Sequence, residues 1–71
     1  TQIRFTLPDA APVRLTVFDL LGREVRVLVD GEMAAGTHDV RFEAGTLASG
    51  TYLYRLETPA QTFTKQMVLM K

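Results

Sequence analysis

Few residues in this chain have the chemistry that catalysis requires. His38 is the single histidine, Ser49 is the single serine, and there is no cysteine. A Ser-His-Asp set could be assembled only from Ser49, His38 and Asp39. Adjacent residues of a β-strand point to opposite faces, so His38 and Asp39 would point apart. A working triad needs the acid to orient the imidazole. The sequence therefore predicts a protein that is not an enzyme.

The residue types that hold metals and phosphates are also dispersed. The aspartates form no EF-hand loop, and no glycine-rich phosphate-binding motif occurs. The glycines are better explained by turns, because glycine adopts positive φ without strain. We expect no cofactor, while a calcium site built from loop carbonyls and one aspartate stays open as an alternative. The residues concerned are Asp9, Asp19, Asp30 and Asp39, and Gly22, Gly31, Gly36, Gly45 and Gly50.

Composition narrows the function classes further. The chain has 71 residues, which is enough for one domain with a small core. Eight basic residues balance eight acidic ones, so no excess positive charge predicts a nucleic-acid partner. No apolar run approaches the roughly 18 residues that span a bilayer, so we expect no direct membrane insertion. Because cysteine is absent, the fold needs no particular redox environment, which suits an exported protein.

The elements that position these residues read as strands. Apolar and polar side chains alternate over residues 2–7 and again over 13–17, the period of a half-buried strand. The apolar faces would hold Ile3, Phe5 and Leu7 in the first strand and Val13, Leu15 and Val17 in the second, with Arg14 and Thr16 facing away.

Residues 18–31 admit two interpretations. Their apolar side chains also fit helical spacing, but Gly22 would cost a helix about 1 kcal/mol, and the β-branched valines favour a strand. We therefore predict a hairpin with a turn over residues 19–23, followed by a strand over 24–29. Asp19 would supply a side-chain acceptor and Gly22 the positive φ. Leu20 or Leu21 would then cover the open end of the core.

The middle of the chain contains an internal repeat. "GEMAAGTH", starting at Gly31, and "GTLASGTY", starting at Gly45, share two glycines, an alanine and a threonine at the same places. Each copy reads as a glycine turn, an apolar plug, a second glycine and the start of a strand. We interpret them as two crossings between the sheets of a sandwich, because two copies are too few for a solenoid.

The repeat also assigns the two tyrosines. It places Tyr52 and Tyr54 at the same positions as His38 and Val40, on a face that points toward the core. Tyr52 follows an "L-x-x-G-x-Y" corner, which resembles the tyrosine corner of Greek-key sandwiches, where the hydroxyl bonds to nearby backbone. A core position is the leading interpretation, and an exposed aromatic platform stays open.

The last predicted strand, "TFTKQMVLMK", is apolar on both faces. Phe63, Met67 and Leu69 share one face, while Val68 and Met70 point the other way. Such a strand is either covered on both sides or available to a partner. Arginines at positions 4, 14, 26, 41 and 55 fall at outward strand positions, either as solvated surface or as a binding stripe. The predicted core consists of Ile3, Phe5, Leu15, Val17, Val40, Phe42, Tyr52, Tyr54, Leu56, Met67 and Leu69.

Several stretches in order resemble one family. "TQIRFTLP", "DLLGREV", "LASGTYLYRL" and "KQMVLMK" look like the type A C-terminal sorting domain of the bacterial type IX secretion system. The resemblance covers essentially the whole chain and implies an all-β, immunoglobulin-like antiparallel sandwich of six or seven short strands. Members usually carry an Asn-Pro-rich stretch before the first strand, and this sequence starts after that point. Because no initiator Met precedes the first strand, Thr1 also looks like a cut within something longer, and the resemblance implies a larger secreted protein whose last domain is residues 1–71.

The resemblance also implies a role and partners. Family members are a non-catalytic address, joined covalently to an N-terminal cargo domain and recognised by outer-membrane export components. The cargo passes the periplasm and is released or attached at the cell surface, often after cleavage by a sortase-like peptidase. The matching recognition positions are Gly22, Arg23, Gly50, Tyr52, Tyr54, Lys65, Met67, Val68, Leu69, Met70 and Lys71.

Three other functions remain as alternatives. The pattern is also similar to the immunoglobulin-like domain of flagellar hook-capping proteins, although an apolar strand ending at Lys71 favours a C-terminal domain. The paired tyrosines could stack on sugar rings in a carbohydrate-binding accessory module. A structural spacer would have neither ligand nor export phenotype.

Overall fold

The computed structural model describes residues 2–43, 45 and 47–70. These residues form six β-strands and no helix. The strands are β1 (Gln2–Leu7), β2 (Ala11–Phe18), β3 (Glu24–Met33), β4 (Gly36–Arg41), β5 (Gly50–Glu57) and β6 (Thr62–Leu69). The predicted all-β class is confirmed.

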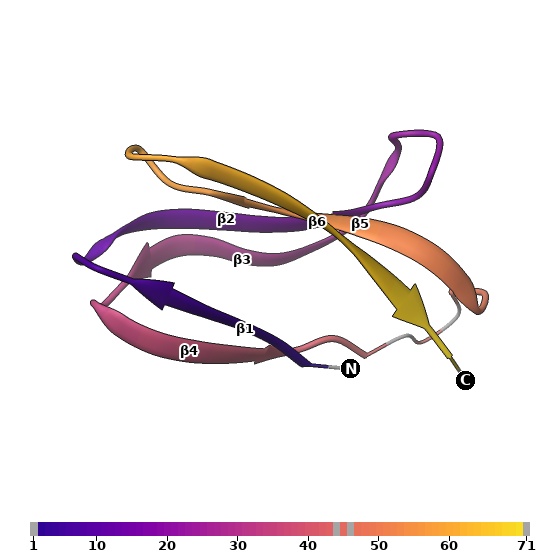
Figure 1. Ribbon diagram of the computed structural model, residues 1–71, viewed down its shortest axis with the longest axis horizontal. Coiled ribbons are helices and arrows are strands. Elements are labelled where there is room, and N and C mark those ends of the chain that lie inside the picture. Colours follow the sequence, from indigo (N-terminus) through magenta and orange to yellow (C-terminus); the bar gives the residue numbers. More distant parts are fainter. Residues whose placement is uncertain (1, 44, 46, 71) are drawn as a thin grey trace.

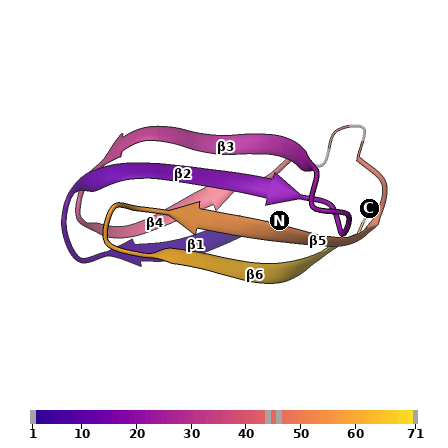
Figure 2. The same cartoon turned by 90° about the horizontal axis from the view of Figure 1, so that it is seen from above.

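The strands form two antiparallel sheets stacked as a sandwich. One sheet has the order β3-β2-β5-β6, and the other is the pair β1-β4. Figure 1 shows the two layers from the side, and Figure 2 shows β1 and β4 beneath the four-stranded sheet. Along the described chain, β6 and β3 are the outer strands of the larger sheet. The immunoglobulin-like antiparallel sandwich expected from the sequence is therefore the observed architecture.

The core lies between the sheets in two adjoining clusters. One gathers Ile3, Leu7, Val13, Leu15 and Leu56, and the other gathers Val17, Phe42, Tyr52 and Leu69. Leu28, Tyr54 and Met67 pack against both, which joins the clusters into one interior. Every predicted core residue is buried or partly buried there. Burying one such aliphatic or aromatic side chain contributes about 1.5–3 kcal/mol, which is the main stabilising term in a domain this small.

The β2–β3 hairpin confirms the choice of strand over helix. The amides of Leu21 and Arg23 both donate to Oδ1 of Asp19, at 2.9 and 3.0 Å, and Gly22 has a φ of 84°. The expectation that Leu20 or Leu21 covers the core is wrong, because they are 66% and 79% exposed. These bonds close the turn on Asp19, and the turn projects beyond the sheet (Figure 1).

Both copies of the repeat cross between sheets, as predicted. The first leads from β3 to β4 and the second from β4 to β5. Met33 packs against the first core cluster and Leu47 against the second, so each copy supplies an apolar plug. One detail is wrong: Gly31 is no turn residue but lies within β3, which extends to Met33 rather than ending at residue 29.

Thr16 lies on the outer face of β2, as predicted, and it is buried there. The β2–β3 register shifts between Leu15 and Thr16, and β2 has neighbours on both sides, with Val27 and Arg55 opposite Thr16. The Oγ1 atom of Thr16 finds no hydrogen-bond partner among the described residues. The outer face of this central strand is thus covered by its neighbours.

Candidate recognition surface

The recognition residues predicted on β5 and β6 are direct partners across one ladder. Gly50 lies opposite Leu69, Tyr52 opposite Met67, and Tyr54 opposite Lys65. The structure thus brings together two groups that are separated in sequence by the turn at residues 58–61. Thr58 and Gln61 close that turn through their backbone and through the Thr58 hydroxyl. Met67 is half-buried and Leu69 is buried, so these two side chains mainly anchor β6 to the core.

Tyr52 forms the predicted tyrosine corner. Its hydroxyl donates to the carbonyl oxygen of Ala48 at 2.7 Å. The first copy of the repeat contains the same arrangement, because Nε2 of His38 donates to the carbonyl oxygen of Ala34, also at 2.7 Å. In each copy, the ring of the residue near the start of the strand therefore forms a hydrogen bond to the loop that precedes the strand. Sequence reasoning found the tyrosine bond and missed the histidine one, although the alignment of the repeat predicts it.

The tyrosines do not form an exposed platform. Tyr52 is buried, and Tyr54 is half-buried against both core clusters. A ring that stacks on a sugar needs one free face. The core position predicted for both tyrosines is therefore the observed one.

The outward face of β6 is polar at Thr62, Thr64 and Gln66, and it becomes apolar and open at the C-terminal end of the strand. Val68 is 60% exposed, and Met70, just after the strand, is 81% exposed. Neither side chain is covered by another part of the described chain. Of the two alternatives for this strand, covered on both sides or available to a partner, the structure therefore shows the second. Lys71 lies outside the described residues. Exposed aliphatic side chains next to each other are typical of surfaces that bind a partner.

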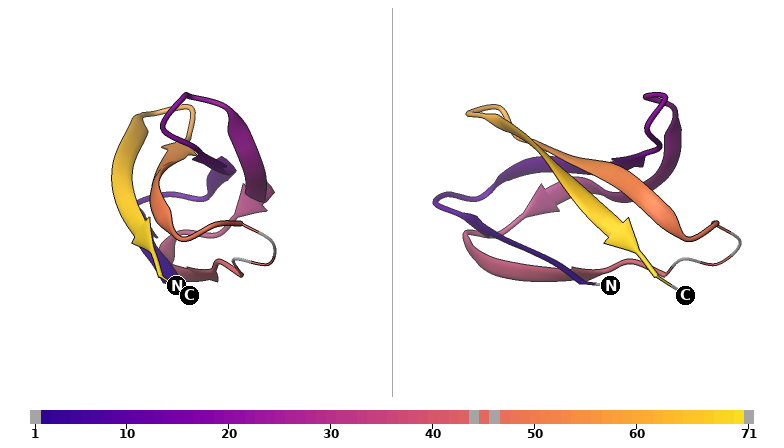
Figure 3. Two further views of the ribbon diagram at one scale, coloured as in Figure 1. Left: turned by 90° about the vertical axis from the view of Figure 1, so that its right-hand side faces the viewer. Right: turned by 45° about the vertical axis from the view of Figure 1, so that its right-hand side comes forward.

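The hairpin residues Gly22 and Arg23 lie apart from this strand. Figure 3 shows the β2–β3 turn and the C-terminal end of β6 at one end of the sandwich, but at separate corners. The Nε of Arg23 donates to Oδ2 of Asp19 at 2.8 Å. The pKa of Asp19 is lowered, first by the hydrogen bond from the Arg23 backbone amide and also by the bonds from the Arg23 side chain and the Leu21 amide. Arg23 thus stabilises its own turn.

The arginines form no single stripe, because they lie on strands of both sheets and each has a local partner. Arg4 pairs with Asp39 at 2.8 Å, Arg14 with Glu24 at 3.1 Å and Arg41 with Glu43 at 2.9 Å. Arg26 donates to the Glu43 carbonyl, and Arg55 lies 4.8 Å from the Phe18 ring centroid. Surface pairs of this kind contribute little to stability, because water and salt screen them.

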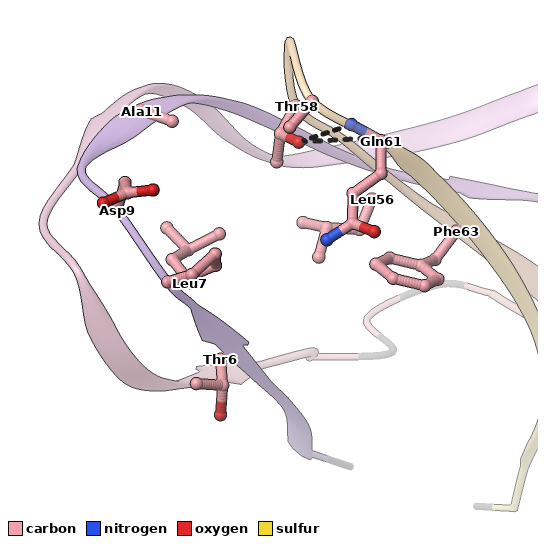
Figure 4. A pocket seen from close by; sticks show the side chains of 10 residues that line it. Thr6, Leu7, Asp9, Ala11, Leu56, Thr58, Gln61 and Phe63 are labelled. Carbon is pink, nitrogen blue, oxygen red and sulfur yellow. Dashed lines mark hydrogen bonds between the residues drawn. The ribbon is translucent and has the colours of Figure 1, made fainter.

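The structure contains a groove between β1 and β6 that the sequence analysis did not predict. We call it the β1–β6 groove; it has a volume of about 230 Å³ and is lined by Arg4, Phe5, Thr6, Tyr54, Leu56, Phe63 and Lys65. A smaller cavity of about 60 Å³ continues it past Leu56 and Phe63 toward Leu7 (Figure 4). β1 and β6 are at opposite ends of the chain, so no local pattern could have revealed it.

His38 and Asp39 point to opposite faces of β4, as the sequence predicts. His38 lies beside the Phe5 ring, with centroids 5.5 Å apart, while Asp39 binds Arg4 on the other face of the strand. In the described ranges no group of three or more His, Cys, Asp or Glu side chains could hold a metal ion. Across those same ranges, no helix is long and apolar enough to cross a membrane.

Comparison with known proteins gives one family. A family model described as the secretion system C-terminal sorting domain matches residues 1–70. No curated protein and no solved structure matches the chain. The matched range includes all six strands and the exposed residues Val68 and Met70.

Proposed function

This chain belongs to the family of type IX secretion C-terminal sorting domains, and we propose that it is a single non-catalytic domain that directs a covalently linked N-terminal cargo through the outer-membrane export machinery. The family is a sorting signal for secreted proteins. The observation that carries the proposal is the family match over residues 1–70. The hook-capping alternative is not favoured by that match, and the sugar-binding alternative is not favoured by the shielded tyrosines.

The proposed mechanism is recognition of a folded surface, with no bond made or broken by this chain. The surface centres on the outward face of β6, where Val68 and Met70 are open to solvent. Covering one such side chain completely contributes about 1.5–3 kcal/mol, so a pocket that takes both can supply much of a micromolar affinity. The core-facing residues of β5 and β6 act indirectly, because they hold this face in place.

The proposed route is export through the periplasm, followed by release or attachment at the cell surface. The partners are outer-membrane type IX components and a sortase-like peptidase that separates the domain from its cargo. The chain has no cysteine, so its fold needs no particular redox environment, which suits a domain that is exported through the periplasm.

The experiment uses a fluorescent cargo with a signal peptide in a bacterium that has a type IX system. Residues 1–71 are fused to the C-terminus of the cargo, and three controls are compared with this fusion. The first lacks the domain, the second lacks β6 and the residues after it (62–71), and the third carries the domain between signal peptide and cargo. We expect cargo at the surface or in the medium only for the complete C-terminal fusion. Equal export of the complete fusion and the cargo without the domain would contradict the proposal and would instead fit a structural spacer.

A further inference from the structure

The main chain of β6 has a free edge that faces the β1–β6 groove. Among the described residues β6 pairs only with β5, and β1 pairs only with β4. A free edge presents a row of unpaired N–H and C=O groups that can accept another strand. Two such edges thus border one apolar groove.

The groove walls are apolar and partly exposed. Phe63 on β6 is 47% exposed, and Tyr54 and Leu56 contribute the floor from β5. Figure 4 shows Phe63 and Leu56 directed toward Leu7 of β1 around the smaller cavity. A strand at this edge would place every second side chain over these walls, because successive side chains point to opposite faces.

The positive charge beside the groove favours an incoming strand that carries acidic side chains. The sequence after Glu57 contains two lysines and no acidic residue, although the whole chain is neutral. Lys65 lines the groove and forms no ion pair among the residues described, whereas Arg4 at the same rim is held by Asp39. Asp39 is paired with Arg4, and Asp9 lines the smaller cavity and not the cavity that holds Lys65.

We propose that the free edge of β6 binds an extended acidic and apolar segment of the export machinery, which becomes a fifth strand of the larger sheet. This inference rests on the proposed function and adds the chemistry of the partner. A glutamate or aspartate of the incoming strand lies next to Lys65. Apolar side chains two positions away on either side lie next to Phe63 and Met67 and fill the groove. The opposite face of the strand extends the exposed surface at Val68.

A second copy of this chain fits the edge less well. Antiparallel pairing of β6 with another β6 brings the Lys65 side chains of the two copies near each other, and neighbouring like charges are destabilising. Lysine on an edge strand is a common device against such self-pairing. The same lysine attracts an acidic strand, so one residue serves both purposes.

The test uses the 71-residue protein labelled for NMR and four short synthetic peptides with a flexible soluble tail. The first alternates valine and threonine and carries glutamate at its centre; the second carries lysine there. The third is the glutamate peptide with alternate amides methylated, and the fourth has the same methylation displaced by one residue. Titration should move the amide signals of β6 and the groove residues. The glutamate peptide should bind about fivefold more tightly than the lysine peptide, which is the effect of one exposed ion pair.

Variants identify the charged partner. K65E should reverse the preference, so that the lysine peptide binds more tightly than the glutamate peptide. R41E makes the same charge change on β4 in the other sheet and should leave the preference as it is. Lys65 and Arg41 are both exposed, so neither change disturbs the core.

Each other result overturns the proposal. No shifts at about 1 mM peptide, shifts confined to β3, or equal affinity of both charge types would do so. Methylation blocks strand pairing only where the amides face β6, so one methylated peptide should lose binding and the other should retain it. If both retain it, no strand is added. Export of the fused cargo is measured separately. If the domain directs export but binds no peptide, only the added strand is rejected. If the cargo is exported equally with and without the domain, the proposed function itself is rejected.

Discussion

The corner hydrogen bond of Tyr52 provides a quantitative prediction about the fold. Tyr52→Phe removes only the hydroxyl that donates to the Ala48 carbonyl at 2.7 Å. A hydrogen bond of this kind contributes about 0.5–1.5 kcal/mol net. Ala48 is exposed, so water can reach its carbonyl in the variant and the cost stays near about 1 kcal/mol. In a domain of this size that corresponds to a Tm lower by roughly 4–8 °C.

The assay is thermal and urea unfolding followed by circular dichroism, with Tyr54→Phe as the matched control. Tyr54 packs against the same core but its hydroxyl forms no hydrogen bond among the described residues, so its variant should change stability by less than about 0.5 kcal/mol. An unchanged urea m-value would show that both variants unfold from the same native structure. The reasoning fails if the two variants lose equal stability.

Three further predictions concern strand β2 and its turn. Thr16→Val replaces a buried hydroxyl without a partner and should raise stability by about 1 kcal/mol in urea unfolding; a loss of stability would mean that the hydroxyl is paired. Gly22→Ala forces a side chain into a φ of 84° and should cost about 1 kcal/mol, so an unchanged Tm would contradict the turn geometry. The lowered pKa of Asp19 contributes stability above its unfolded pKa of about 3.9, which is lost as the pH falls through the lower folded value. Asp19→Asn should therefore reduce the loss of stability at acid pH in a curve of unfolding free energy against pH. An unchanged loss would mean that other carboxylates cause it.

The strands and the core were predictable because they follow from local patterns. The period of two in residues 2–7 and 13–17 identified the buried faces, and the valines of β3 decided for a strand. The repeat predicted both sheet crossings and placed Tyr52 in the core. These features depend on the residue order within short segments, which is what a single sequence shows.

The remaining features depend on long-range geometry. Leu20 and Leu21 are exposed because the turn closes on the Asp19 carboxylate, which their apolar character does not indicate. Thr16 is buried because a register shift and two flanking strands cover it. The β1–β6 groove exists because strands from the two ends of the sequence meet at one side of the sandwich.

The candidate recognition surface was predictable in part. The sequence showed that Val68 and Met70 share a face, and only the structure shows that this face is open. The direct pairing of Tyr52 with Met67 and of Tyr54 with Lys65 depends on register, which the hydrophobic pattern alone leaves unassigned.

Secretion of two matched variants tests the central claim most directly. Val68 and Val27 are both exposed valines on outer strands of the larger sheet, at 60% and 39%, and either can be changed to aspartate. Both variants are first checked for a cooperative thermal transition. If the outward face of β6 is the address, Val68→Asp lowers export of the fused cargo toward the level without the domain, while Val27→Asp leaves export unchanged. Equal export of the two folded variants would contradict the account.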